Sequence, residues 1–91
     1  MIGLTRSAAL DGAADGIRIN ALLPGSTRSE MFERQMLTRP GGEDGTRARN
    51  PLGRISAPAE QAEAALWLLS DAASFITGEC LTADGGTTAR C

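Results

Sequence analysis

The sequence predicts an α/β fold in which two parallel strands are joined by a long, mainly helical connection. An apolar, β-branched run from Ile17 to Leu23 ends in Pro24-Gly25, and a second strand-like run from Glu79 to Asp84 ends in Gly85-Gly86. A connection of this length and helical character joins strands that run parallel, with a right-handed crossover. Open α/β sheets bind ligands at the carboxyl ends of their strands, so a site is expected at these two glycine-containing ends.

The first expected element is a helix from Ile2 to Ala14. Apolar and small residues recur there at close to helical spacing, and Asp15-Gly16 supplies a stop because glycine readily adopts the left-handed conformation that ends many helices. The strand over residues 17–23 follows, and its far end is apolar on both faces. Such a strand is typical of a parallel sheet that is covered on both sides.

A loop from Pro24 to Ser29 separates this strand from a short helix that is expected over Glu30 to Leu37. Ser29 is a suitable N-cap, and acidic residues in the first turn favour the positive end of the helix dipole. The segment from Thr38 to Ala57 is the least regular part of the chain. We expect its glycine-rich portion, residues 41–45, to be the mobile edge of a lid, because long irregular loops in compact domains are commonly lids.

The clearest helix pattern runs from Pro58 to Leu69. Proline suits the first position of a helix, and one helical face is predicted to be apolar and buried. That face comprises Ala62, Ala65, Leu66, Leu69 and Ala73. A further helical turn over Ser70 to Ser74 and a turn at Thr77-Gly78 lead into the last strand. Since a parallel pair alone is not a stable sheet, we expect an open edge beside the strand over residues 17–23.

The composition argues against several classes of protein. The chain has 91 residues and a net charge of -2, and its nine basic residues are all arginines spread along the sequence, so no basic stripe for nucleic acid is present. No apolar run approaches the ~20 residues of a membrane span, and no signal peptide is recognisable. Two cysteines without histidine indicate neither a disulfide framework nor a zinc site, and no metal is expected. A cytoplasmic location is the resulting expectation.

Histidine, tyrosine and lysine are all missing from the sequence. A Ser-His-Asp or Cys-His site, a Schiff-base lysine and a tyrosine general acid are therefore excluded from these residues. An acid-dyad hydrolase that uses Asp84 and a glutamate is a weak alternative, because nothing in the sequence places two carboxylates together. No catalytic residue is assigned.

Six short motifs occur in a fixed order along the chain. They are Gly3 to Ala9, Ile17 to Asn20 leading to Pro24-Gly25, Pro51 to Arg54, Pro58 to Ala62, Ser74 to Gly78, and Asp84 to Gly86. In this order and spacing they resemble the C-terminal third of a classical short-chain dehydrogenase/reductase. The resemblance covers essentially all of residues 1–91. It implies the C-terminal part of a Rossmann-type doubly wound parallel sheet, as one segment of a single domain whose N-terminal cofactor-binding half is absent.

The resemblance also implies where a cofactor, NAD or NADP, would bind. Pro24, Gly25, Ser26 and Thr27 take the place of the family's turn that contacts the nicotinamide carboxamide, and glycine there would let the backbone approach a flat ring closely. Ser29 stands where the family usually has a cofactor-contacting threonine, and it keeps the hydroxyl. A role as a simple N-cap is equally open for Ser29, and the two roles are compatible.

The same resemblance implies structural roles for some other positions and a substrate-binding role for one variable segment. Asn20 is interpreted as structural, and Asp84-Gly85-Gly86 as a turn and subunit-contact element. The segment from Arg28 to Arg54 matches the family's variable substrate-binding region.

The family's glycine-rich pyrophosphate loop, its catalytic serine and its Tyr-x-x-x-Lys pair do not occur in these residues. The resemblance therefore implies a portion of an NAD(P)-dependent oxidoreductase that moves hydride between nicotinamide and an alcohol or ketone, and that is inactive alone. Its expected partners are the cofactor, a small alcohol or ketone, and further copies in a homo-oligomer. The alternative is a catalytically inactive truncated fragment that serves at most as an oligomerisation or interaction partner of intact subunits.

Overall fold

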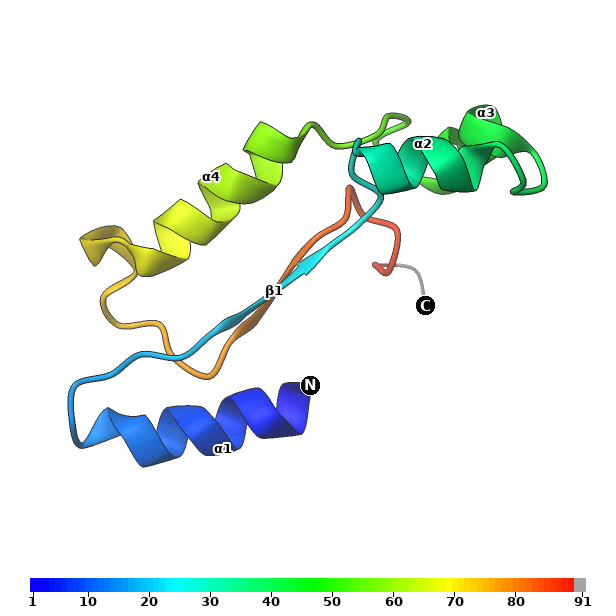
Figure 1. The fold of residues 1–91 in the computed structure, drawn as a ribbon. Helices are drawn as coiled ribbons and strands as arrows, with labels where there is room; N and C mark the ends of the chain where they lie inside the picture. The colour runs from blue at the N-terminus through cyan, green and yellow to red at the C-terminus, as the bar shows by residue number, and fades with distance from the viewer. Residues whose placement is uncertain (90–91) are drawn as a thin grey trace.

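The computed structural model describes residues 1–89, which form two strands and several helices. The elements are α1 (Ile2–Ala13), β1 (Ala21–Pro24), α2 (Glu30–Met36), α3 (Gly42–Arg49), α4 (Pro58–Leu69), the 3₁₀ turn η1 (Asp71–Ala73) and β2 (Cys80–Ala83). The strands pair in parallel, with Ala21 opposite Cys80 and Pro24 opposite Ala83. Helices α1 and α4 lie on opposite sides of the pair, while α2 and α3 extend beyond its carboxyl ends (Figure 1). The predicted α/β class and parallel pairing are confirmed.

β1 is shorter than the strand predicted over residues 17–23, and before Ala21 the chain is held by side-chain hydrogen bonds together with one backbone bond, from the Gly78 N–H to the Ile19 carbonyl (2.8 Å). The Asn20 amide donates to the Ile76 carbonyl (3.1 Å), and the Asn20 Oδ1 accepts from the Glu79 N–H (3.0 Å). Thr77 Oγ1 likewise accepts the Ile19 N–H at 3.1 Å. The structural interpretation of Asn20 is confirmed, since its side chain stands in for a strand partner.

Arg18 connects the chain entering β1 to the end of α4. Its guanidinium donates to the carbonyl of Leu68 (2.8 Å), and also to those of Ile76 (3.3 Å) and Ser70 (3.4 Å). The last carbonyls of a helix have no partner within the helix, and a cation near them also interacts favourably with the helix dipole. Arg18 therefore satisfies the C-terminal end of α4 and joins it to the strand pair.

Helix α3 covers most of residues 41–45, so the prediction that this segment is an irregular loop is wrong. Glu43 and Asp44 lie in its first turn, and Arg47 and Arg49 lie in its last turn, as the helix dipole favours. Glu43 and Arg47 also form an i,i+4 ion pair at 2.8 Å. This arrangement of charges offsets the helix-weakening effect of the glycines.

Helix α4 has the predicted bounds, and Pro58 begins it as expected. The predicted buried face is confirmed at Ala73, which is 0% exposed, but not at Leu66 and Leu69, which are 61% and 79% exposed. The buried side chain of α4 itself is Leu68 (6% exposed), which was not predicted. Only one side of α4 lies against β1, so its other apolar residues remain in contact with solvent. The predicted further turn after α4 is confirmed as η1.

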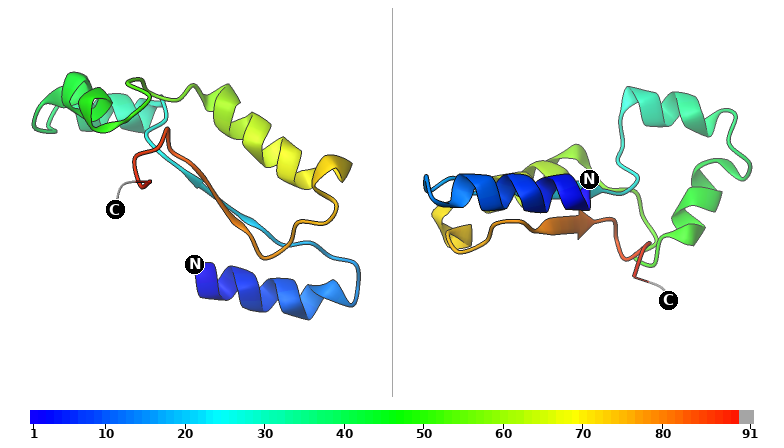
Figure 2. Two further views of the ribbon diagram at one scale, coloured as in Figure 1. Left: turned by 180° about the vertical axis from the view of Figure 1, so that it is seen from behind. Right: turned by 90° about the horizontal axis from the view of Figure 1, so that it is seen from below.

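The apolar core of the described residues is small. Its buried side chains are Ala9, Phe32, Leu68 and Ala73. The large apolar side chains that are exposed are Met1, Ile2, Leu4, Leu10, Ile17, Met31, Leu37, Leu52, Leu66, Trp67, Leu69 and Phe75. The radius of gyration is 15.7 Å, compared with about 12 Å for a compact domain of this length. The open shape (Figure 2) agrees with the expectation of a bare flank along β1, which pairs only with β2 within residues 1–89.

No helix among residues 1–89 combines the length and the apolar character that crossing a membrane requires. Cys80 is a free thiol, and Cys91 lies outside the described residues.

Candidate functional site

The loop that follows β1 is tied to the rest of the chain at both of its ends. The Gly25 N–H donates to the Ala83 carbonyl at the end of β2 (3.0 Å). Further along, the Ser56 N–H donates to the Ser26 carbonyl (3.0 Å), and the Arg28 N–H donates to the Ser56 carbonyl (2.9 Å). The predicted site residues therefore form one ordered segment at the carboxyl ends of both strands.

Gly25 is required by its packing against Asp84. A Cβ built on Gly25 would lie 2.7 Å from both the Cα and the Cβ of Asp84. Carbon atoms in packed proteins attract at about 3.5–4.0 Å, so this space does not admit a side chain. The neighbouring strand end therefore requires glycine here by itself, whatever else approaches the backbone.

The Asp84 carboxylate closes the turn that follows β2. Its Oδ1 accepts the Gly86 N–H (3.0 Å), and its Oδ2 accepts both the Thr88 hydroxyl (2.7 Å) and the Thr88 N–H (3.1 Å). The Thr88 hydroxyl, followed by these backbone donors, lowers the pKa of Asp84 below its ordinary value. A carboxylate held ionised in this way is a turn element, as the sequence suggested, and not a proton donor.

Two hydroxyl groups of the loop offer complementary hydrogen-bonding capacity. Thr27 Oγ1 donates its proton to the Gly25 carbonyl (3.0 Å), which leaves its lone pairs to accept. Ser29 Oγ accepts the Phe32 N–H (3.1 Å) as the N-cap of α2, and its own proton remains able to donate. The N-cap prediction is confirmed. The loop therefore carries one hydroxyl with free acceptor capacity and one with a free donor.

A cavity of about 320 Å³ opens beside the loop. It is lined by Leu23, Pro24, Gly25, Ser26, Thr82, Asp84, Thr87 and Thr88. A second cavity of about 230 Å³ shares Ser26 and Asp84 with the first and extends toward Asn50, Arg54 and Gln61. The structure thus places Pro24, Gly25 and Ser26 in a hollow at the strand ends. Thr27 and Ser29 follow them in the loop and are not among the residues that line it.

Two residues that hold this region together were missed from the sequence. The Gln61 amide donates to the Ala83 carbonyl (2.8 Å) and to Ser56 Oγ (3.2 Å), and it thereby links α4 to the end of β2 and to the loop. Arg28 pairs with glutamates of both α2 and α3. No spacing rule could have connected Arg28 with α3, because α3 was not predicted. Within the described part of the chain, no cluster of carboxylate, thiol or imidazole groups is arranged to hold a metal ion.

The turn at Gly85 packs against the end of the segment that carries α2 and α3. The Leu52 N–H donates to the Gly85 carbonyl (3.2 Å) and to Asn50 Oδ1 (3.0 Å), and Asn50 Nδ2 donates to the Arg54 carbonyl (2.8 Å). Gly85 has a φ of +64°, and a Cβ on it would lie 2.8 Å from Asn50 Nδ2. Both the backbone conformation and the space therefore require glycine here.

We expect Gly85→Ala to lower the free energy of unfolding by about 2 kcal/mol, through the left-handed backbone and the lost hydrogen bonds of Asn50. Gly53→Ala is the matched control, because Gly53 has a φ of +73° and a Cβ on it would meet no atom within 4 Å. The control should lose only about 1 kcal/mol. Urea unfolding followed by circular dichroism measures both, and equal losses would show that the contact with Asn50 is unimportant.

Glu60 stabilises the start of α4 in a way that depends on pH. Its carboxylate pairs with Arg54 (2.6 Å) and accepts the Ala57 N–H (2.9 Å), and these contacts lower its pKa from 4.5 to about 2. Ala57 has no side-chain oxygen, so only the glutamate half of a capping box is present.

Because the pKa of Glu60 is depressed in the folded state, its contribution to stability is complete above pH 4.5 and is lost as the pH falls toward about 2. We expect the protection of the amides at the start of α4, measured as their exchange rate relative to an unstructured peptide at the same pH, to fall over this range. In Glu60→Gln, the same amides should be less protected at pH 6, and their protection should show a weaker dependence on pH. An unchanged pH dependence in this variant would assign the effect to another group.

Comparison with known proteins finds dehydrogenases and reductases among the relatives of this chain. The family model for enoyl-(acyl carrier protein) reductase matches residues 1–88. The 2,5-dichloro-2,5-cyclohexadiene-1,4-diol dehydrogenase of Sphingobium indicum is 56% identical over 89 residues, which cover 98% of this chain and 36% of that protein. The A-factor type gamma-butyrolactone 1'-reductase of Streptomyces virginiae is 46% identical, over 97% of this chain and 34% of its own length. The chain thus spans about a third of the length of these relatives.

Solved structures agree with the sequence comparison. A short-chain dehydrogenase family protein from Francisella tularensis superposes with a TM-score of 0.86 at 32% identity, over 98% of this chain and 40% of that one. 4-Hydroxyisoleucine dehydrogenase complexed with NADH gives a TM-score of 0.88 at 31% identity, over 99% of this chain and 37% of that one. The predicted resemblance and the Rossmann-type α/β fold are confirmed. The chain belongs to the short-chain dehydrogenase/reductase family, and it is a C-terminal segment of that fold.

Proposed function

We propose that this chain forms one wall of the nicotinamide pocket and the substrate lid of an oxidoreductase that moves hydride between NAD or NADP and an alcohol or ketone. The observation that carries the proposal is the hollow at the carboxyl ends of β1 and β2, which Pro24, Gly25 and Ser26 help to line. Thr27, with a free acceptor, and Ser29, with a free donor, follow in the same loop. Relatives of the same fold with bound NADH and NADP support the choice of cofactor. When bound, the nicotinamide supplies or takes up the hydride, and this loop holds its carboxamide.

The proton-transfer groups of such a reaction are not found among these 91 residues, which lack tyrosine, lysine and histidine. We propose that residues 1–91 are one segment of a single catalytic domain and that its other half supplies these groups. The open edge of β1 and the exposed apolar side chains support this division. The chain alone is therefore expected to turn over neither NAD(H) nor NADP(H).

A segment exchange tests the proposal. The matching third of the Sphingobium indicum dehydrogenase is replaced by this chain, and the hybrid is assayed for nicotinamide binding and for diol oxidation. We expect the hybrid to bind the cofactor, and the double variant Thr27→Val/Ser29→Ala to bind it about tenfold more weakly, as expected for the loss of one or two hydrogen bonds. Ser74→Ala is the matched control, because Ser74 is exposed and distant in sequence from the loop. A folded hybrid without cofactor affinity would contradict the proposal.

A second candidate function is an inactive partner that associates with copies of itself or with intact subunits. Phe75 is fully exposed, and Leu66 and Leu69 of α4 are mostly exposed, so these apolar side chains would gain from burial in an interface. We expect analytical ultracentrifugation to detect association, and Leu69→Ser/Phe75→Ser to reduce it. A monodisperse monomer with a sharp two-state melt would argue against this function.

We place either function in the cytoplasm, because a free thiol such as Cys80 persists in a reducing compartment.

A further inference from the structure

Helices α2 and α3, with the turn that joins them, form a unit that we call the α2–α3 unit (residues 30–49). Each helix has one buried side chain, Phe32 in α2 and Thr46 in α3, and each of these is 5% exposed. The Thr46 hydroxyl lies within hydrogen-bonding distance of two acceptors, the Gly42 carbonyl in its own helix (3.2 Å) and the sulfur of Met36 in α2 (3.6 Å), so Thr46 brings the two helices into contact. The unit extends away from the strands and from α4, beyond the carboxyl end of the sheet (Figures 1 and 2). Its position therefore depends on the chain segments that enter and leave it and on the side chains that cross between them.

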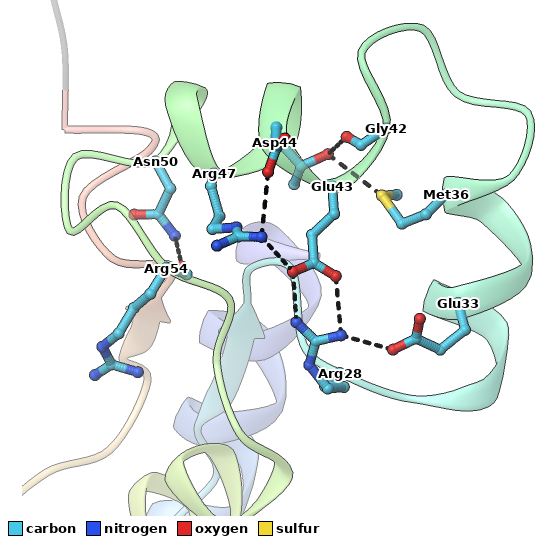
Figure 3. Close-up of polar contacts among 10 residues, drawn as sticks. Arg28, Glu33, Met36, Gly42, Glu43, Asp44, Arg47, Asn50 and Arg54 are labelled. Atoms are coloured by element: carbon cyan, nitrogen blue, oxygen red, sulfur yellow. Dashed lines mark hydrogen bonds and ion pairs between the residues drawn. The ribbon is translucent and has the colours of Figure 1, made fainter.

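Arg28 lies immediately before the α2–α3 unit in the sequence, and its side chain reaches from the loop to both helices of the unit. Its guanidinium contacts both carboxylate oxygens of Glu43 in α3, at 3.0 and 2.9 Å, and one oxygen of Glu33 in α2, at 2.6 Å (Figure 3). It also lies over the ring of Phe32, 5.3 Å from the ring centre. A two-pronged guanidinium–carboxylate pair is stronger and more specific in geometry than a single surface contact. One side chain thus holds both helices of the unit.

The backbone of Arg28 belongs to the candidate cofactor loop. Its N–H donates to the Ser56 carbonyl (2.9 Å), and Thr27 pairs with Ser56 in a parallel bridge. The backbone is fixed on the loop side while the guanidinium is fixed on the α2–α3 unit. Glu43 is held in turn by Arg47 (2.8 Å) within α3. The contact between Arg28 and Glu43 therefore connects the position of α3 to the position of the loop.

We propose that Arg28 is an ion-pair latch that holds the α2–α3 unit in one position relative to the loop at the strand ends, and that loss of this side chain or high salt releases the unit. The side chain of Glu43 is 28% exposed and that of Arg28 is 45% exposed, so the pair is accessible to screening by salt. Arg28 lowers the pKa of Glu43, which keeps the pair charged near neutral pH. The latch requires no nicotinamide, so its failure would leave the proposed function untouched.

Hydrogen exchange followed by mass spectrometry on the full chain tests the latch. At low salt we expect the amides of α3 to exchange roughly threefold or more faster in Arg28→Gln and in Glu43→Gln than in the unmodified chain. At 1 M NaCl the α3 amides of the unmodified chain should exchange at nearly the rate seen in Arg28→Gln. The exchange rate in Arg28→Gln should itself change little with salt. Glu33→Gln removes a single, more exposed contact and should have a smaller effect.

Arg54→Gln is the matched control, because Arg54 and Glu60 form a two-pronged pair of similar distances, 2.6 and 2.7 Å, at the start of α4. It should accelerate exchange at the start of α4 and leave α3 unchanged. The proposal is overturned if Arg28→Gln leaves α3 exchange unchanged, or if it accelerates α3 and the middle of α4 equally. It is also overturned if α3 of the unmodified chain exchanges at the rate of an unstructured peptide at low salt.

Discussion

Replacing Arg18 with methionine is expected to lower the free energy of unfolding by about 2–4 kcal/mol, because hydrogen bonds from a charged donor to buried or half-buried acceptors are lost together. The carbonyls of Leu68, Ser70 and Ile76 all accept from this one guanidinium. Methionine keeps the apolar stem of the side chain, so the loss reports mainly on the donor group. The midpoint of urea unfolding, followed by far-ultraviolet circular dichroism, measures it.

Arg6→Met provides the comparison for the same chemical change at an exposed position of α1. It should change stability by no more than about 0.5 kcal/mol, as surface substitutions usually do. Arg18→Lys keeps the charge but loses the fork of donors, and its stability is expected to lie between those of the parent and Arg18→Met. If Arg18→Met and Arg6→Met shift the midpoint equally, the hydrogen bonds from Arg18 to the three carbonyls do not stabilise the fold.

The contacts of Arg18 show why local sequence patterns could not predict this part of the fold. Its partners lie 50 to 58 residues away in the sequence, and no periodicity or spacing rule joins positions so far apart. By contrast, the cap at Ser29 and the start of α4 at Pro58 depend on residues within one turn, and both were predicted correctly. The parallel pairing was also predictable, because a long helical connection leaves few other arrangements.

Helix α3 shows how competing local signals misled the prediction. Its glycines indicated a loop, whereas the order of its charges, acids first and arginines last, is typical of a helix. The charge pattern is the sequence feature that indicates this helix, whereas the glycine content alone indicates a loop. The buried side of α4 was a different problem, because apolar residues lie on more than one of its faces, and only tertiary contact with β1 decides that Leu68 is the buried one.

The candidate site was predictable in position but not in detail. The end of an apolar strand at Pro24-Gly25 indicated a loop at the carboxyl edge of the sheet, and the structure places the loop there. The roles of Gly25 and Arg28 depend on Asp84 and Glu43, which only the folded chain brings close to them. Sequence reasoning therefore located the loop, while the reasons for its individual residues required the structure.

Gly25→Ala is expected to lower the free energy of unfolding by about 3 kcal/mol, at the upper end of the usual cost of overpacking. The new Cβ would lie 2.7 Å from the Asp84 Cα and 3.3 Å from its carbonyl carbon, so the backbone at the end of β1 must move away from β2. This movement weakens the Gly25–Ala83 hydrogen bond (3.0 Å) and displaces the loop that follows. In the segment-exchange hybrid, the same variant should bind the nicotinamide cofactor more weakly.

Gly3→Ala serves as the control, because Gly3 lies within α1 and a Cβ there meets no atom within 4 Å. That variant should be neutral or more stable by up to about 1 kcal/mol, as alanine is the better helix former. Asp84→Gly in the Gly25→Ala background separates the two possible sources of the clash. It removes the Asp84 side chain but leaves its Cα, so it should restore little stability. Full recovery would mean that the side chain alone excludes a Cβ at Gly25, and that the two strand ends can separate at little cost.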